Sequence, residues 1–407
     1  MQIPFSPPYI DQSVIEEVTG SLRSGWITTG PKVKALENIV AQFCGVENAL
    51  AVNSATSAMM LVLHWFGVSR GDEVIVPAYT YCATALAAMH IGATLVMVDV
   101  KEDFTIDPAT VAKAITPKTK AIITVDFGGW PCDYDSIYTL VNDDKIKNIF
   151  TPNSENQKTL NRILILADAA HSLGAVYKNK KSGTIADITV FSFHAVKNIT
   201  TAEGGVITFN MPAPFNNKII YDTLRLWSLN GQTKDAFTKS TAGGWKYDIV
   251  YPGFKMNMPD VLAAIGFAQM KKYAAHLLPA RKNIFELYNE AFKKFDWAIV
   301  PPFAKEGCQS SYHIYPLRIK NISEADRDKI IELIFAKGIS VNVHFIPMPM
   351  LSVFKNAGFH IKDFPVSYSL YANEITLPLY PQLTTEQCRY VINTVGQSVK
   401  TVTADER

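Results

Sequence analysis

The sequence predicts an α/β protein with two domains: a large α/β/α domain on a mostly parallel sheet, and a smaller C-terminal α+β domain. Short apolar segments alternate with helical ones through the first half of the chain, which is the pattern of βαβ units. The chain has 407 residues, whereas a single core stops growing at about 250–300 residues. The periodicity also changes near Met258. We therefore expect a large domain over residues 1–250 and a small domain over residues 251–407.

The strands of the large domain are predicted from apolar runs that are short and bounded by turn residues. They fall at residues 49–53, 73–77, 94–99, 121–125, 162–168 and 188–193, with helices at 58–66, 84–91 and 108–114. Such runs are typical of parallel strands that helices cover on both faces. In the C-terminal part we predict helices at 259–273, 279–295 and 323–337, and strands at 312–319 and 340–344.

Two segments are expected to lie outside this framework. Residues 143–161 are polar and rich in Asn and Lys, which indicates a surface insertion before the strand at 162–168. Residues 401–407 are expected to form a frayed tail.

Composition and charge argue against several classes of protein. Lys and Arg number 39 and Asp and Glu 37, so the formal charge of +2 argues against nucleic acid or an anionic membrane as the main partner. The five cysteines form no CxxC pair, which argues against a disulfide framework or a zinc ribbon, and we predict no metal site. The first residues lack the pattern of a secretory signal, and no apolar run reaches the roughly 18 residues of a membrane span. We expect a soluble cytoplasmic protein.

Two segments that follow predicted strands suit a phosphorylated, planar ligand. Residues 53–58 (NSATSA) lie where the N–H groups and partial positive charge of a helix start suit a phosphate. Taken alone, these Ser and Thr residues are better explained as a helix cap. Residues 77–81 (PAYTY) place tyrosines at another strand end, where one ring can stack on a planar ligand. For each tyrosine alone, a core or interface position is the better explanation.

An acid and an amine follow two further strands. Asp168 ends an apolar strand, where it could pair with a protonated pyridine nitrogen or, equally well, cap the next helix. His171 could orient Asp168 or be an ordinary core histidine. Lys197 follows the strand at 188–193, and a buried amine there would have a lowered pKa and attack an aldehyde. Ser192, five positions earlier, could donate to a phosphate. One site that uses all these groups is more economical than separate coincidences.

At these residues the chain resembles the DegT/DnrJ/EryC1/StrS family, the sugar aminotransferases among the fold-type I enzymes that use pyridoxal phosphate (PLP). The branch it most resembles makes 4-amino sugars on nucleotide carriers, as in lipopolysaccharide modification. The similar segments are residues 24–31, 53–58, 71–77, 168–171, 192–197, 200–205, 253–260, 311–313, 344–347 and 377–381.

The resemblance implies a role for each candidate residue. Lys197 would form the Schiff base with the cofactor, and Asp168 would pair with its pyridine nitrogen. Tyr81 would stack on the ring, and Thr56, Ser57 and Ser192 would bind the phosphate. Lys255 falls where many members have an asparagine that reaches the cofactor phosphate of the neighbouring subunit. The resemblance thus implies a homodimer with shared sites, L-glutamate as donor, a nucleotide-linked keto-sugar as acceptor, and pyridoxamine phosphate as the aminated cofactor.

Two other functions are compatible with the same fold. One is a sugar dehydratase of the same family that retains pyridoxamine phosphate, but its members have histidine at the position of Lys197. The other is a regulatory protein that binds a ligand without catalysis. The presence of both Lys197 and Asp168 argues against it, because a binding protein would not need the pair.

Overall fold

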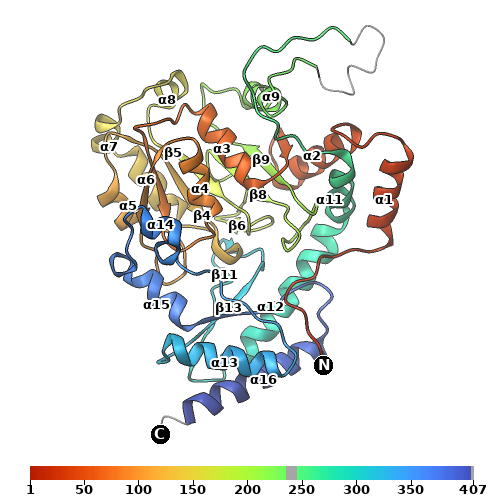
Figure 1. Cartoon of the computed structure of the whole chain (residues 1–407), viewed down its shortest axis with the longest axis vertical. Helices are drawn as coiled ribbons and strands as arrows, with labels where there is room; N and C mark the ends of the chain where they lie inside the picture. Colours follow the sequence, from red (N-terminus) through yellow and green to blue (C-terminus); the bar gives the residue numbers. More distant parts are fainter. Residues whose placement is uncertain (235–244, 405–407) are drawn as a thin grey trace.

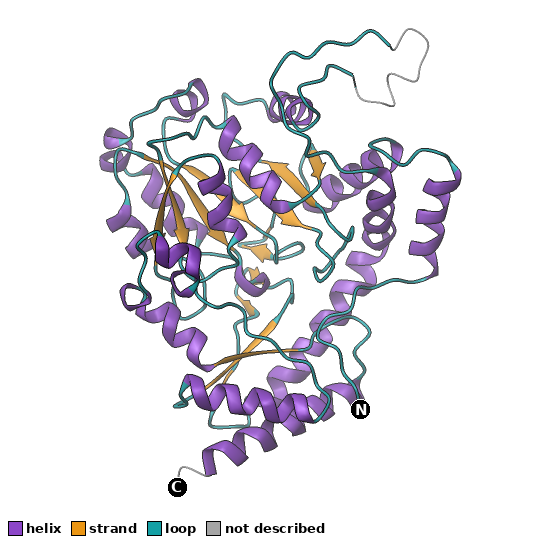
Figure 2. Cartoon of the chain, in the orientation of Figure 1, coloured by secondary structure: helices purple, strands orange, loops and turns teal. Residues whose placement is uncertain are grey.

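The computed structural model describes residues 1–234 and 245–404 of the protein. Within them, the central sheet contains β1 (Ala49–Val52), β2 (Glu73–Pro77), β3 (Thr94–Val98), β4 (Thr119–Val125), β5 (Leu164–Asp168), β8 (Ile188–Ser192) and β9 (Gly205–Phe209). Their order is β1-β9-β8-β5-β4-β2-β3 (Figures 1 and 2). Only β9 runs antiparallel to its neighbours, so the sheet is mostly parallel as predicted.

Helices cover both faces of this sheet because its strands are apolar on both sides. In β2, Val74 and Val76 join one core cluster and Ile75, between them, joins another. The first face packs against α3 (Ala55–Trp65), α4 (Ala83–His90) and α9 (Asn217–Trp227). The second packs against α2 (Pro31–Cys44), α5 (Pro108–Ala114), α6 (Tyr134–Asn142) and α11 (Asp260–Lys272). Helix α1 (Gln12–Arg23) packs on α11.

The C-terminal part has its own sheet and core. Strands β10 (Ala298–Ile299), β13 (Tyr315–Ile319) and β14 (Glu374–Leu377) form an antiparallel sheet. Its core draws on α12 (Leu278–Phe292), α13 (Glu324–Ala336) and α16 (Thr385–Ala404), and Ile3 from the N-terminal segment joins it. Since α11 packs with the helices of the large sheet, the division at residue 250 stays a prediction.

Short elements connect these two parts. A small ribbon is built from β6 (Val176–Tyr177), β7 (Lys180–Lys181), β11 (Ala304–Lys305) and β12 (Cys308–Gln309). The remaining elements are η1 (Phe127–Gly129), α7 (Asp144–Ile149), α8 (Glu155–Leu160), η2 (Tyr273–Leu277), η3 (Met348–Met350), α14 (Ser352–Asn356), η4 (Ile361–Asp363) and α15 (Pro365–Asn373). None of the described helices is long and apolar enough to cross a bilayer.

Two local predictions were wrong, the strand at 340–344 and the tail at 401–407. Residues 340–344 form no strand and make only an isolated bridge between Asn342 and Thr376, because side chains rather than a strand take the polar backbone groups of His344. The expected surface position of residues 143–161 is confirmed, since most of them are exposed; they form α7 and α8, and the buried Gln157 donates to the Phe66 carbonyl at 3.1 Å. The predicted tail is helical to Ala404, and its last three residues lie outside the described part.

Candidate active site

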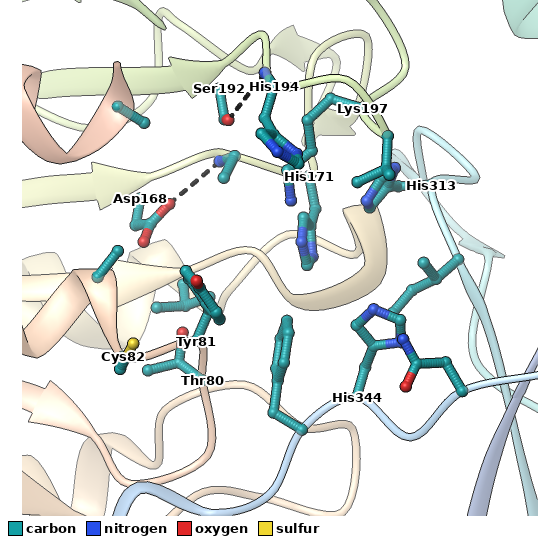
Figure 3. A pocket seen from close by; sticks show the side chains of 18 of the residues that line it. Thr80, Tyr81, Cys82, Asp168, His171, Ser192, His194, Lys197, His313 and His344 are labelled. Atoms are coloured by element: carbon teal, nitrogen blue, oxygen red, sulfur yellow. Dashed lines mark hydrogen bonds between the residues drawn. The ribbon is translucent and has the colours of Figure 1, made fainter. Parts of the chain in front are cut away.

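A cavity of about 670 Å³ lies at the carboxyl ends of the parallel strands (Figure 3). One wall, the strand-edge wall, comes from the segments that follow β1, β2, β5 and β8. The opposite wall, the small-domain wall, comes from residues 342–346, Leu377 and Leu379. Six of the predicted site residues line this cavity, namely Thr56, Tyr81, Asp168, His171, Ser192 and Lys197. The structure therefore gathers residues that are widely separated in sequence, as strand order in an open α/β sheet allows.

Asp168 is held in place by two donors. The Thr84 hydroxyl donates to its Oδ2 at 2.7 Å, and the backbone N–H of Ala170 donates to its Oδ1 at 3.2 Å. Burial raises the pKa of Asp168, while these hydrogen bonds and the charge of Lys197 oppose the rise. A buried carboxylate of this kind gains from a cationic partner, such as a protonated ring nitrogen, presented from the cavity.

Lys197 supplies the amine of the site. It lies in the turn after β8 and its side chain enters the cavity (Figure 3). Burial lowers the pKa of Lys197 to about 8, and the negative charge of Asp168 partly offsets the effect. About a tenth of the amine is therefore unprotonated at pH 7, and the unprotonated form is the one that attacks a carbonyl carbon.

The start of helix α3 forms a cradle for an anion. Ser54 caps the helix by accepting from the Ser57 N–H at 3.0 Å. The N–H groups of Ala55 and Thr56 have no acceptor among the described residues, and Ser54, Ala55 and Thr56 line the cavity. Gly205 keeps this cradle open from below, because a Cβ there would lie 2.6 Å from the Ala55 nitrogen.

Two predicted residues lie away from the cavity. Ser57 does not line it, since its hydroxyl accepts from the Ser54 hydroxyl at 2.9 Å. Lys255 is exposed on a segment that pairs with Leu229 and whose neighbour Met256 accepts from the Asn53 N–H at 2.8 Å. It therefore lies outside the cavity of its own chain, beside the end of β1.

No hydrogen bond joins His171 to Asp168 within the described residues, and Nδ1 of His171 accepts from the Gly128 N–H at 3.2 Å. Its ring instead packs against His313, with 4.3 Å between the ring centroids. Burial, followed by the nearby positive charge of Lys197, lowers the pKa of His171 well below its usual range. His171 is thus a neutral imidazole at the cavity, and a catalytic role for it stays a prediction.

Sequence reasoning gave no role to three residues that shape the site. Thr84 anchors Asp168, and His313 and His344 line the cavity. His313 also bonds to Asn198, the residue after Lys197, with Nδ1 2.9 Å from Oδ1. A threonine in the first turn of the helix after a strand was the available signal for Thr84. The histidines lay in segments similar to the family, but no local pattern connected them with Lys197.

Tyr81 stands at the mouth of the cavity. Its side chain is 61% exposed, and its ring centroid lies 5.9 Å from that of Phe345 on the small-domain wall. It therefore presents an open aromatic face beside Asp168 and Lys197 (Figure 3). The described residues contain no group of acidic, His and Cys side chains that could hold a metal ion.

Comparisons with known proteins find similar chains over nearly the whole length of this one. The model of the DegT/DnrJ/EryC1/StrS aminotransferase family matches residues 8–150 and 156–396. A solved structure described as "Putative sugar aminotransferase Spr1654 from Streptococcus pneumoniae, PMP-form" is 44% identical, with a TM-score of 0.94 over 98% of this chain and 100% of that one. Its PLP form is 42% identical, with a TM-score of 0.93 over 99% and 100% of the two chains.

Two further relatives cover nearly the whole chain. The spore coat polysaccharide biosynthesis protein SpsC of Bacillus subtilis is 35% identical over 98% of this chain and 97% of its own length. Helicobacter pylori PseC, an aminotransferase involved in the biosynthesis of pseudoaminic acid, is 27% identical, with a TM-score of 0.85 over 98% and 100% of the chains. The predicted fold class is confirmed as the fold-type I architecture, and the chain belongs to the DegT/DnrJ/EryC1/StrS aminotransferase family.

Proposed function

We propose that this protein transfers an amino group from L-glutamate to a keto-sugar carried on a nucleotide, with a 4-keto sugar as the first candidate. The cofactor is PLP, which cycles with pyridoxamine phosphate. The observation that carries the proposal is the pair formed by Lys197 and Asp168. One cavity contains an amine with a pKa of about 8 and a buried carboxylate that forms no direct ion pair with any described residue.

The residues of the cavity fit the cofactor at three points. The N–H groups of Ala55 and Thr56 would hold the phosphate together with the Ser192 hydroxyl. Asp168 would hold the pyridine nitrogen in its protonated form, which offsets the cost of its burial. Tyr81 would cover the ring from the exposed side. When bound, PLP supplies an aldehyde carbon that accepts an amino group and a ring that draws electrons toward its nitrogen.

Lys197 would perform two tasks with the same atom. Its Nζ holds the cofactor before the amino donor arrives. Once the donor has displaced Lys197 from the cofactor, Nζ would take the proton from Cα of the donor and would return it at the C4′ carbon of the cofactor. A pKa near 8 suits both directions of this transfer, because a base works best when its pKa lies near the working pH.

The relatives support a sugar as the acceptor. The Streptococcus protein is described as a sugar aminotransferase, SpsC acts in polysaccharide biosynthesis, and PseC acts in the biosynthesis of pseudoaminic acid. We propose the synthesis of a cell-surface sugar as the purpose of the reaction. A nucleotide-linked substrate would be met in the cytoplasm, and a homodimer would place Lys255 of one chain beside the phosphate of the other.

The proposal is tested with a panel of nucleotide-linked keto-sugars. The purified enzyme is incubated with PLP, L-glutamate and each sugar, and the products are identified by mass. We expect one member of the panel to gain an amino group in place of its ketone while 2-oxoglutarate accumulates. Conversion to a deoxy-keto product without consumption of glutamate would instead indicate a dehydratase. A purified protein that takes up no PLP would indicate a binding protein.

A further inference from the structure

Three residues behind the small-domain wall form a hydrogen-bonded chain that ends at the cavity. Nδ1 of His344 lies 3.0 Å from the Thr376 hydroxyl, and this hydroxyl bonds to Oε1 of Glu374. The backbone N–H of His344 donates to Oε2 of the same carboxyl at 3.0 Å. Thr376 and Glu374 are fully buried in β14, whereas His344 lines the cavity. The chain thus links a buried carboxyl to the space that receives the substrates.

The ring of His344 has a fixed orientation. Its backbone carbonyl accepts from the Tyr79 hydroxyl at 2.7 Å. Its ring stacks on Phe5, with 5.6 Å between centroids and 21° between planes. Because Nδ1 is committed to Thr376, Nε2 is the ring nitrogen left for a ligand, and it has no partner within the described residues. Figure 3 shows this ring on the opposite side of the cavity from Asp168.

We propose that Glu374, Thr376 and His344 form a relay that sets whether Nε2 of His344 donates a hydrogen bond to the sugar substrate or accepts one from it. This inference rests on the proposed function, because that function supplies the sugar.

The relay has two arrangements that differ by one proton. Oε2 of Glu374 receives the His344 N–H in both, so only Oε1 can change its role. When the carboxyl is ionised, Thr376 donates to Oε1 and accepts from Nδ1–H, which leaves Nε2 as an acceptor. When Oε1 carries a proton, it donates to Thr376. Thr376 then donates to Nδ1, and Nε2–H becomes a donor.

The surroundings of Glu374 bring this change close to neutral pH. Burial raises the pKa of Glu374 to about 8, against the effects of its bonds to Thr376 and His344 and the charge of Arg327. Arg327 from α13 reaches the backbone carbonyl of Glu374 at 3.4 Å rather than its carboxyl. The protonated arrangement, with Nε2–H as a donor, therefore dominates below about pH 8.

Other charged and titratable groups also face the relay. Arg318 lies opposite Glu374 in the sheet, but its guanidinium donates to the carboxylate of Glu102 at 2.7 Å. The Tyr79 hydroxyl is buried near Glu374, whose charge helps to raise the pKa of Tyr79 further. Across the cavity, Lys197 lies close enough to His344 for its positive charge to disfavour a protonated imidazole.

A sugar suits this wall better than a carboxylate does. Burial, followed by the charge of Lys197, lowers the pKa of His344 to about 3, so the ring is neutral. A neutral imidazole matches a hydroxyl or keto oxygen, whereas a carboxylate prefers a cation. Phe5, Phe345 and Ile346 add apolar surface beside His344 for the C–H face of a sugar ring.

The first experiment breaks the relay at its centre. Thr376→Val removes the hydroxyl at nearly constant volume, and Thr376→Ser is the matched control that keeps it. We expect the valine variant to raise KM for the keto-sugar by about 2- to 12-fold, the size of one net hydrogen bond. The glutamate half-reaction and the serine variant should match the parent. An unchanged KM for the sugar, or an equal loss in the glutamate half-reaction, would overturn the inference.

The second experiment fixes the direction of the relay. In Glu374→Gln the amide oxygen accepts from the His344 N–H and the amide nitrogen donates to Thr376 at every pH. Nε2–H is then a permanent donor. The parent should lose kcat/KM for the keto-sugar as pH rises through about 8, and the glutamine variant should lose less. Lys197 titrates in the same range in both enzymes, so the difference between their profiles belongs to Glu374. Identical profiles would contradict the inference.

The third experiment needs no substrate and separates this inference from the proposed function. Nitrogen NMR of 15N-histidine enzyme reports the tautomer of His344, assigned with His344→Gln. In the parent, the proton should move from Nε2 to Nδ1 as pH rises through about 8. In Glu374→Gln it should stay on Nε2. A tautomer that stays the same across this pH range and in Glu374→Gln would contradict the relay, whether or not any sugar is aminated. A panel without product would contradict the proposed function and the contact of Nε2 with a sugar, but it would leave the proton relay itself standing.

Discussion

The two walls of the cavity are built in different ways. The strand-edge wall carries Asp168, Ser192 and Lys197 at the ends of neighbouring strands of a buried sheet. The small-domain wall carries His344 on an irregular segment held by a carboxyl and a hydroxyl from two other elements. In the proposed function, the first wall would serve chemistry that both half-reactions share, and the second would contact only the sugar. Substitutions in the first wall should therefore damage both half-reactions, and substitutions in the second only one.

The largest effect is expected at Lys197. Lys197→Ala removes the amine that holds the cofactor and moves the proton, so both half-reactions should slow by about 100- to 10,000-fold or more. PLP should still bind without a covalent link. Absorbance changes of the cofactor in single-turnover experiments measure each half-reaction. Lys180→Ala, on exposed β7, is the matched control and should behave as the parent. If both half-reactions of Lys197→Ala ran within tenfold of the parent rates, Lys197 would not take part in the chemistry.

A smaller effect, again on both half-reactions, is expected at Asp168. Asp168→Asn leaves a buried ring nitrogen without its carboxylate, and loss of one partner of a buried pair costs about 3 kcal/mol or more, on the order of a hundredfold. The exposed control Asp144→Asn should have no effect. Near-normal amination of the cofactor by glutamate in Asp168→Asn would refute the role.

The same variant should shift the pH dependence of Lys197. The amine reacts only when unprotonated, so the rate at which the apoenzyme captures PLP should rise with pH, with a midpoint near 8. The negative charge of Asp168 favours the protonated amine and raises its pKa. Removing that charge should therefore move the midpoint below 8, as measured by stopped-flow absorbance. A midpoint that moves upward would contradict the proximity of the two groups.

Lys255 differs from both walls, because it lies outside the cavity of its own chain, and we predict that it acts on the cofactor of the partner subunit. If it reaches the partner's phosphate, Lys255→Ala should weaken PLP retention by about 10- to 100-fold, the range of a charge-assisted bond. Mixed dimers give the decisive control. Combining Lys197→Ala chains with Lys255→Ala chains should restore activity if Lys255 acts across the interface, because one site then carries neither defect. If mixing restores nothing, Lys255 does not act in trans. If Lys255→Ala binds PLP as tightly as the parent does, Lys255 is simply a solvent-exposed lysine without a role in cofactor binding.

The smallest effect is expected at Gly205, beneath the phosphate cradle. Gly205→Ala forces a Cβ to within 2.6 Å of the Ala55 nitrogen, so we expect a loss of about 1–3 kcal/mol of unfolding free energy and weaker PLP retention. Gly20→Ala, in the last turn of α1 with no atom within 4 Å of its Cβ, is the control and should gain about 0.5–1 kcal/mol. Urea unfolding measures both, and equal stability of the two variants would contradict the close approach.

The position of the strand-edge wall was predictable from sequence patterns, because its residues lie at the ends of short apolar runs or a few residues beyond them. Asp168 and Lys197 could be predicted to lie together once the ends of β5 and β8 were placed on the same edge of the sheet. Ser57 shows the limit of this reasoning, since the sequence of a helix cap does not say which hydroxyl turns inward. The Ser57 hydroxyl accepts from the Ser54 hydroxyl, and the cavity is lined by Ser54 and Thr56 instead.

The small-domain wall was not predictable to the same degree. Residues 340–344 have the alternation of a strand, yet tertiary contacts with Glu374 and Tyr79 hold the segment in an irregular path. The position of His344 depends on contacts between elements far apart in the sequence. No local periodicity contains that information, and only the resemblance to a family marked this segment in advance.

The central claim is that Lys197 is the amine that holds PLP at the strand edge. The most direct measurement is reduction of the PLP-loaded enzyme with borohydride, followed by proteolysis and peptide mapping by mass. The account predicts that the reduced cofactor is attached to Lys197 in the peptide that spans the turn after β8. Attachment to any other lysine, or a catalytically active enzyme in which Lys197 carries no label, would contradict it.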